Sequence, residues 1–120
     1  PAMVSAAIRE ADAAVIAFDS LSPGYALTLP NKLFEAIAAG LPVLGAETPA
    51  LSDFFAEHPI GLLWRPGDPA DLARAIARLR EPAARQQWQR AARQAQLRVG
   101  WPTQAPQLVA SYRQIAPTSR

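Results

Sequence analysis

The chain has 120 residues, a length that suits one domain of ordinary size. Half of its residues are hydrophobic and 18% are charged, so a packed core is expected and intrinsic disorder is excluded. No apolar run approaches the roughly 20 residues that a membrane-spanning helix needs. The sequence contains no cysteine, which excludes disulfides and thiolate metal sites and suits a reducing cytoplasm.

Charge is distributed unevenly along the chain. Residues 1–64 hold two basic and seven acidic side chains, a net charge of −5, whereas residues 65–120 hold ten basic and three acidic ones, a net charge of +7. An Arg-rich second half suits an anionic partner such as a lipid surface or a nucleic acid. One Lys against eleven Arg is also typical of a GC-rich genome, and this compositional interpretation is the simpler one.

The first elements read as a helix, a buried strand and a loop. A short amphipathic helix is predicted over residues 3–11. Residues 13–18 form a continuous apolar run that Asp19 ends, which is typical of a parallel strand buried on both faces. Residues 19–29 contain Ser, Pro and Gly and are predicted to form a loop.

Residues 30–46 predict a helix that leads directly into a second buried strand, at 42–46. Pro30 suits the first helical position, where its missing N–H costs nothing, and Gly40 suits a left-handed C-terminal cap. Four apolar residues at the spacing i, i+3, i+4 and i+7 are expected to face a core: Phe34, Ile37, Ala38 and Leu41.

Three polar side chains near the start of this helix lie outside the apolar stripe: Asn31, Lys32 and Glu35. The free backbone N–H groups at a helix N-terminus attract anions. An acid, a base and an amide at this position therefore suit the phosphate and the sugar of a nucleotide.

Two later helix starts have clear signals. Thr48-Pro49 and Asp68-Pro69 each combine a capping side chain with a proline at the first helical position. A third short strand is predicted between them, at 61–64.

Residues 83–120 are expected to form a C-terminal helical tail. One helix is predicted over about residues 83–98, and a last helix follows a break at residues 100–102. The apolar side of this last helix contains Ala105, Leu108, Val109 and Tyr112. The three tryptophans are expected to pack under helices: Trp64, Trp88 and Trp101.

Strands that alternate with helices at this spacing predict an α/β fold, a Rossmann-like three-layer domain with a parallel sheet between helices on both sides. Three strands are few for such a sheet, which usually carries about five or six. The chain also opens on a helix instead of a strand. We therefore expect residues 1–120 to be the second half of a larger nucleotide-binding domain.

Several motifs occur in an order that resembles one known family. They are Glu10-Ala11-Asp12-Ala13-Ala14-Val15, Glu35-Ala36-Ile37-Ala38-Ala39-Gly40-Leu41-Pro42-Val43, Ile60-Gly61-Leu62-Leu63 and Pro66-Gly67-Asp68-Pro69. This order resembles the C-terminal, donor-binding domain of GT-B glycosyltransferases, in particular the large retaining group similar to glycosyltransferase family 4 (glycosyl transferases group 1). The resemblance covers roughly residues 5–115.

The resemblance implies that Glu35 binds the donor nucleotide. The family's signature is two glutamates separated by seven residues, and Glu35 matches the second, which contacts the ribose hydroxyls in relatives. The first glutamate contacts the transferred sugar in relatives and would fall at Leu27. Because leucine replaces it here, the motif does not identify the sugar that the donor carries. Residues 29–35 match the Leu-Pro-Asn-Lys-Leu-Phe-Glu of a recognised subset letter for letter, which indicates a subfamily variant.

The residues themselves also allow simpler roles. A carboxylate can accept hydrogen bonds from two vicinal hydroxyls, but Glu35 could instead pair with Lys32 on the helix surface. Lys32 suits phosphate contact or a solvated charge, and Asn31 suits ligand contact or the helix start. His58 has no second metal ligand at a usable spacing and is expected at the surface.

The loop before the helix that starts at Pro30 is the other candidate ligand-binding segment. The resemblance implies that backbone N–H groups of four of its residues meet the diphosphate: Gly24, Tyr25, Leu27 and Thr28. A plain connecting loop is the alternative. Asp19 and Ser20 either face the ligand-binding crevice at the carboxyl ends of the strands or simply end the strand at 13–18.

The leading hypothesis is the donor-binding part of a glycosyltransferase of hexosyltransferase type. The resemblance implies a nucleoside-diphosphate sugar as donor substrate, no cofactor or metal, and no nucleic-acid partner. It also implies a separate N-terminal domain that binds the acceptor, so the chain alone is expected to be inactive. We expect a cytoplasmic enzyme, peripheral at most to the inner membrane. We also expect this fragment to form a two-fold dimer that covers either the exposed edge of strand 13–18 or the helix faces that lack their neighbours.

Two alternatives stay open. An Arg-rich helical module would bind an anionic membrane surface or RNA. Arg74, Arg78 and Arg85 share helical spacing, but the aromatic residues needed for base stacking are missing. A GT-B-fold nucleotide-sugar epimerase fragment would need a histidine and paired acids in the crevice, where His58 is poorly placed.

Overall fold

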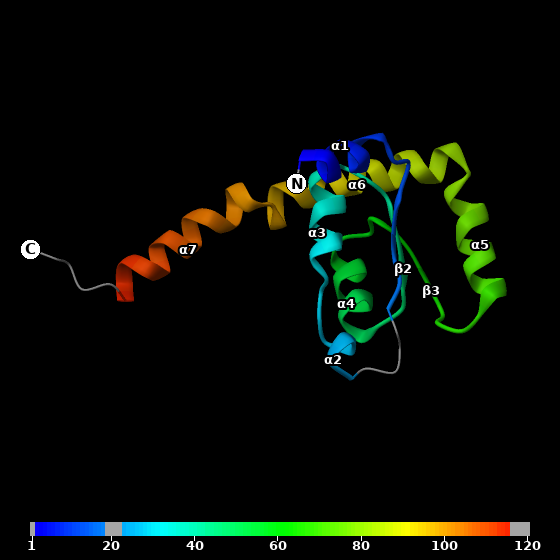
Figure 1. Ribbon diagram of the computed structural model, residues 1–120, viewed down its shortest axis with the longest axis horizontal. Helices are drawn as coiled ribbons and strands as arrows, with labels where there is room; N and C mark the ends of the chain where they lie inside the picture. The colour runs from blue at the N-terminus through cyan, green and yellow to red at the C-terminus, as the bar shows by residue number, and fades with distance from the viewer. Residues whose placement is uncertain (1, 19–22, 116–120) are drawn as a thin grey trace, which may run out of the picture.

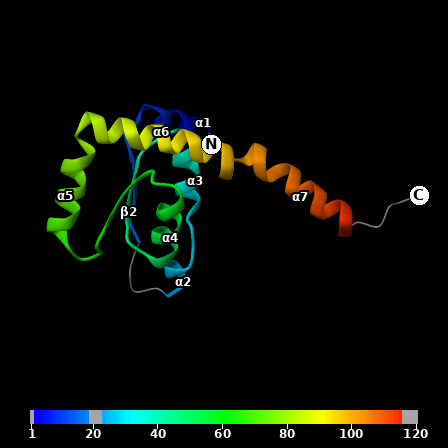
Figure 2. The same ribbon diagram turned by 180° about the vertical axis from the view of Figure 1, so that it is seen from behind.

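The computed structural model describes residues 2–18 and 23–115, and Figures 1 and 2 show it from opposite sides. Its centre is a sheet of three parallel strands in the order β1-β2-β3: β1 (Ala14–Ile16), β2 (Val43–Ala46) and β3 (Gly61–Trp64). The predicted α/β fold with a parallel, Rossmann-like sheet is therefore confirmed. The first strand is shorter than the predicted range 13–18.

Helices cover both faces of the sheet, as predicted. Three of them pack on one face: α3 (Asn31–Ala38), α4 (Pro49–Glu57) and α6 (Pro82–Val99). The fourth, α5 (Pro69–Leu79), packs on the opposite face, and Figure 1 shows it on the other side of the strands.

The remaining described helices lie at the periphery: α1 (Ala2–Glu10), α2 (Pro23–Ala26) and α7 (Trp101–Ile115). α1 precedes the amino end of β1, and α2 follows its carboxyl end, so the two helices lie toward opposite ends of the sheet (Figures 1 and 2). The region predicted as a loop over residues 19–29 thus contains one helical turn.

Alternating side chains on β2 divide the core into two clusters. Val43 points to the face covered by α3, α4 and α6, and Leu44 points to the α5 face. Gly61 allows the close approach of β3 to β2, because a Cβ at this position would lie 1.8 Å from the backbone oxygen of Val43. Both clusters are formed by buried apolar side chains, so the sheet is covered on both faces over β2 and β3.

The start and the buried face of α3 differ from the prediction. Pro30 is the N-cap residue and not the first helical residue. The residues that α3 buries are Leu33, Ala36 and Ile37. Phe34 is 38% exposed, and Ala38 is exposed, because the helix is rotated by about one residue from the expected stripe.

The carboxyl end of α3 is held by backbone and tertiary hydrogen bonds. Gly40 has φ +70°, as predicted, and its N–H donates to Ile37 O at 2.9 Å while Leu41 N–H donates to Ala36 O at 2.9 Å. Gln96 of α6 adds two bonds, since its Nε2 donates to Ile37 O at 2.7 Å and to Ala38 O at 3.1 Å. α6 therefore fixes the end of the helix that carries Glu35.

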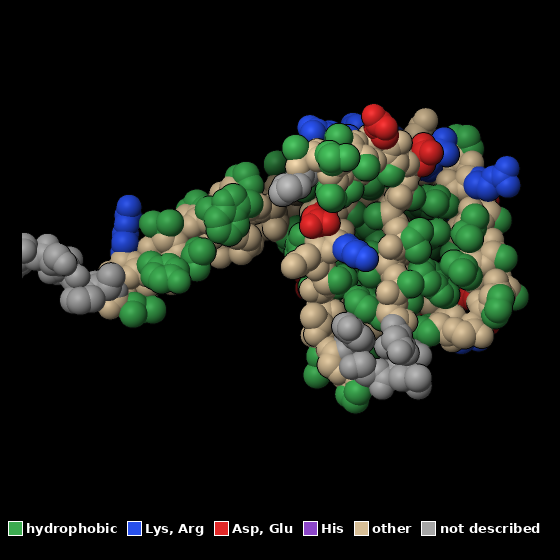
Figure 3. Space-filling view, viewed as in Figure 1, with side chains coloured by type: hydrophobic (Ala, Val, Ile, Leu, Met, Phe, Trp, Pro, Cys, Tyr) green, Lys and Arg blue, Asp and Glu red, His purple; other side chains and the backbone are tan. Residues whose placement is uncertain are grey.

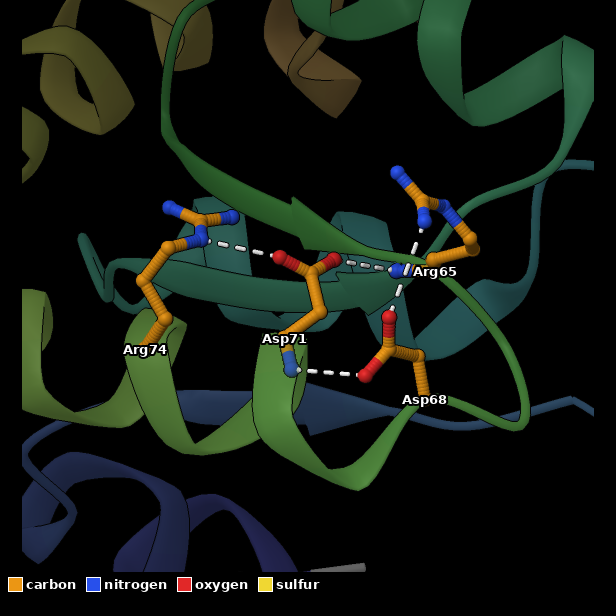
Figure 4. A network of polar contacts seen from close by, with 4 residues as sticks. All are labelled: Arg65, Asp68, Asp71 and Arg74. Atoms are coloured by element: carbon orange, nitrogen blue, oxygen red, sulfur yellow. Dashed lines mark hydrogen bonds and ion pairs between the residues drawn. The ribbon is translucent and has the colours of Figure 1, made fainter.

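The start of α5 is a network of acids and arginines (Figure 4). Asp68 caps the helix, since its Oδ1 accepts from Asp71 N–H at 3.0 Å. Asp71 accepts from the Arg65 backbone N–H at 2.7 Å and from Arg74 Nε at 2.8 Å. These two donors hold the pKa of the Asp71 carboxyl below its ordinary value. The Pro66-Gly67-Asp68-Pro69 motif therefore has a structural role, joining β3 to α5.

The last helix lies outside the core. α7 buries none of its residues and extends away from the body of the molecule (Figure 1). Trp64 and Trp88 are buried, but Trp101 is 68% exposed, so the expectation that it packs under a helix is wrong.

Candidate functional site

Lys32 and Glu35 face the groove between α3, α1 and the free side of β1. A pocket of about 270 Å³ is lined by both side chains, by Val4 and Ile8 of α1 and by Val15 of β1. Figure 3 shows acidic and basic side chains next to each other over α3 on this face of the molecule. Glu35 itself is exposed, so its carboxylate is accessible to a ligand.

The pocket opens at the uncovered edge of the sheet. Among the described residues, β1 pairs only with β2. Val15 is 61% exposed, although Leu44, its neighbour in register on β2, is 1% exposed. α5 therefore covers β2 and leaves the same face of β1 open.

The amino end of α3 has no side-chain cap. Pro30 makes no capping hydrogen bond, and the first turn contains no acid. Asn31 is the first residue of the helix, and both Asn31 and Lys32 are exposed. In the first turn the Leu33 N–H donates to Pro30 O at 3.1 Å. The amino end of α3 therefore combines the positive end of a helix with a base and an amide, an arrangement that can bind an anion.

The loop candidates lie apart from Glu35. Thr28 Oγ1 donates to Gly24 O at 2.6 Å, which closes the turn of α2. Leu27 is 84% exposed. None of Gly24, Leu27 or Thr28 lines either pocket that Glu35 lines. Asp19 and Ser20 lie outside the described residues, as does the placement of the Tyr25 side chain.

Comparison with protein families gives a match over two thirds of the chain. The model of the family described as glycosyl transferases group 1 matches residues 2–81, which span α1 to the end of α5. The chain belongs to the glycosyl transferases group 1 family. No curated protein and no solved structure matches it.

Two further polar residues of the glycosyltransferase chain lie near Glu35. Ser5 and Arg9 of α1 line a second pocket of about 490 Å³ together with Glu35. Arg9 Nε donates to Ser5 O at 3.2 Å, which keeps the guanidinium along its own helix. Neither residue was predicted from the sequence, because only the packing of α1 beside α3 brings them to Glu35. One feature of the sequence could have identified Arg9 as a candidate site residue. It is the first basic residue within residues 1–64, whose net charge is −5.

His58 is not a surface residue, contrary to expectation. Its side chain is 10% exposed, and its ring centroid lies 4.8 Å from that of Phe54. It lines a different pocket from Glu35, between α4 and α6. The described residues contain no group of three or more His, Cys, Asp or Glu side chains that could hold a metal ion. None of the described helices is long and apolar enough to span a bilayer.

Proposed function

We propose that this chain is the donor-binding part of a glycosyltransferase that transfers a sugar, of hexosyl type, from a nucleoside-diphosphate sugar to an acceptor. The observation that carries the proposal is the family match over residues 2–81. The sugar nucleotide is the donor substrate, and the chain's own side chains bind and orient it.

Glu35 is proposed to bind the ribose of the donor. A carboxylate can accept hydrogen bonds from two adjacent hydroxyls at once, and the charge strengthens each bond. Two observations support this role. Glu35 is exposed beside the open edge of β1, and it forms no ion pair with Lys32 or any other described residue, so the carboxylate is free to accept.

The diphosphate is proposed to bind near the amino end of α3. Lys32, the Asn31 amide and the positive amino end of the helix supply positive charge and donors. The backbone N–H groups of residues 24–28 are proposed to reach the diphosphate from the other side. That contact would require the turn at α2 and the amino end of α3 to face a common ligand.

Leu27 changes how the sugar is held. Its side chain is apolar and cannot accept a hydrogen bond from a sugar hydroxyl. We therefore propose that the hydroxyls of the transferred sugar are bound by backbone groups or by residues outside this chain.

The acceptor is proposed to bind to a separate domain, so this chain alone is inactive. We also propose a cytoplasmic enzyme, and we propose that two copies of the isolated chain associate through the edge of β1. The exposed Val15 supports this association, because an unpaired apolar edge recruits another strand.

The test compares two glutamates in the full-length enzyme. Glu35→Gln is expected to lower kcat/KM for the nucleotide-sugar donor by about 1–3 kcal/mol in transition-state terms, the scale of a lost charge-assisted hydrogen bond. Glu57→Gln is the matched control, because Glu57 is 82% exposed on α4 and away from this groove. Unchanged donor kinetics in Glu35→Gln, or an equal loss in both variants, would contradict the ribose role.

A further inference from the structure

The carboxyl end of α3 is completed by a helix outside the family match. The match ends at residue 81, and α6 follows it. α6 packs on the same face of the sheet as α3, with Ala92 and Ala95 in the cluster that also contains Leu33 and Ile37 of α3. α3 therefore depends on a neighbour that the family-matched region does not contain.

Gln96 of α6 satisfies the last carbonyls of α3. Its Nε2 donates to Ile37 O at 2.7 Å and to Ala38 O at 3.1 Å. Ile37 O also accepts from the Gly40 N–H at 2.9 Å. The residue four positions after Ala38 is Pro42, which has no N–H to continue the helical bonding pattern. The Gln96 amide therefore replaces the donor that the backbone lacks at this carbonyl.

Arg93 of α6 lies over the same helix end. A Cβ at Gly40 would lie 3.6 Å from Arg93 Cγ and 3.8 Å from Arg93 Nε, so the arginine side chain passes across the turn that ends α3. The carboxyl end of a helix carries partial negative charge, and a cation beside it is stabilising. α6 thus supplies a hydrogen-bond donor and a positive charge to this end, whereas the amino end of α3 has no side-chain cap.

These contacts bear on Glu35 because α3 is short. The helix has eight residues and is about 12 Å long, too short to be stable by itself. Glu35 O accepts from the Ala39 N–H at 3.1 Å, so Glu35 begins the last turn of the helix, whose carbonyls bind Gln96. Apolar contacts with the core are non-directional, whereas hydrogen bonds fix both distance and angle. Gln96 therefore restricts where α3, and the carboxylate that it carries, can lie.

We propose that Gln96 is a positioning residue for donor binding that acts through Glu35. This role rests on the proposed function, in which Glu35 binds the ribose of a nucleoside-diphosphate sugar. Gln96 lines neither pocket that Glu35 lines, so it acts without touching the ligand. Without its hydrogen bonds, α3 occupies the binding position for a smaller fraction of the time, and the apparent affinity for the donor falls by that fraction.

The test is equilibrium binding of nucleoside diphosphates to the full-length protein by isothermal titration calorimetry. Uridine, guanosine and adenosine diphosphates share the ribose and the diphosphate, and the one that the wild type binds most tightly serves as the probe. Gln96→Leu keeps the approximate size of the side chain and removes the donor. It is expected to raise the Kd roughly fivefold, the scale of one hydrogen bond. Gln96→Glu keeps the shape but cannot donate when ionised, and it is expected to raise the Kd at least as much.

Gln87 provides the matched controls. It is an exposed glutamine of α6, nine residues before Gln96 and therefore on the opposite side of the helix, about two and a half turns away. Gln87→Leu and Gln87→Glu are expected to change the Kd less than about twofold. Circular dichroism checks that each variant keeps its helices. A loss of folded protein lowers the binding stoichiometry and leaves the Kd of the folded chains unchanged.

A double-mutant cycle separates positioning from general stability. If Gln96 acts through Glu35, Gln96→Leu is expected to raise the Kd less than about twofold in a Glu35→Gln background, because the group that it positions is already changed. A role in stability alone would leave the two effects independent.

Two groups of results would overturn the proposal. Where Glu35→Gln weakens binding, the positioning role is contradicted by an unchanged Kd in both Gln96 variants, by an equal loss in the Gln87 variants, by a full effect of Gln96→Leu in the double variant, or by a change in stoichiometry alone. Each of these leaves the ribose role standing. Unchanged binding in Glu35→Gln, or no binding of the three diphosphates by the wild type, contradicts the proposed function itself, and the positioning role falls with it.

Discussion

The starts of α3 and α5 are two solutions to the same structural problem. Each helix follows a parallel strand of one sheet and must satisfy the free N–H groups of its first turn. α5 does so with its own acids, because Asp68 caps the helix and Asp71 links it to Arg65 and Arg74 (Figure 4). α3 has no side-chain cap and no acid in its first turn.

This difference distinguishes a family motif that has a structural role from one that has a proposed ligand-binding role. At α5 the carboxylates already occupy the positive end of the helix and would repel an anionic ligand. At α3 no carboxylate lies in the first turn, and the charged side chains Lys32 and Glu35 line an open pocket. The motif around residues 66–69 therefore builds the fold, and the motif around residues 29–35 is the proposed ligand site.

The largest expected effect comes from closing the amino end of α3. Pro30 has φ −75° and ψ 152°, an extended conformation that a capping residue adopts. Pro30→Asp is expected to lower kcat/KM for the donor by about 1–3 kcal/mol, because a carboxylate would compete with the diphosphate for the same N–H groups. Donor kinetics of the full-length enzyme measure this loss.

Pro30→Ser is the control for this variant, since serine also caps the helix but adds no charge. It is expected to keep most of the donor affinity. If the Asp and Ser variants lose donor use equally, the diphosphate does not depend on the charge at this helix end.

Removing the cap of α5 is expected to have an intermediate effect, on stability alone. Asp68→Ala should lower the free energy of unfolding by about 1 kcal/mol, the usual cost of a lost N-cap. Donor kinetics at a temperature where both proteins are folded should not change. Urea denaturation followed by circular dichroism measures the stability, and a fall in donor affinity would place the α5 start in the site.

The smallest expected effect concerns the pH dependence of stability. The pKa of Asp71 is lower in the folded chain than its ordinary value, because the Arg65 N–H and the Arg74 guanidinium stabilise the carboxylate. Its contribution is therefore fully present above about pH 4 and is lost as the pH falls through the lowered folded-state pKa. Asp71→Asn should remove this part of the acid dependence.

Thermal denaturation between neutral pH and about pH 3 measures that effect. Asp53→Asn, an exposed acid on α4, is the control and should leave the acid dependence as it is. An identical acid dependence in the wild type and in Asp71→Asn would contradict the assigned role of the Arg65 and Arg74 contacts.

Local signals in the sequence were sufficient for most of the helices and strands and for the parallel sheet, although the helical turn α2 was predicted as part of a loop. The Thr48 and Asp68 caps, the left-handed Gly40 and the short apolar strands each depend on residues a few positions apart. Capping side chains, glycine turns and apolar runs of this kind can be recognised in the sequence without a tertiary structure. The parallel direction of the strands followed from the sequence because helices connect them.

The tertiary structure decided which residues face each other. α3 contains two overlapping apolar patterns, one with Leu33 and Ala36 and one with Phe34 and Ala38, and periodicity alone does not choose between them. Packing against the sheet and α6 selected the first. Glu35 lies outside both patterns, so its exposure was predictable, but the pocket it shares with Arg9 depends on where α1 packs. The exposed stripe of α7 was equally undetermined, because an amphipathic helix specifies an apolar face and not the surface that covers it.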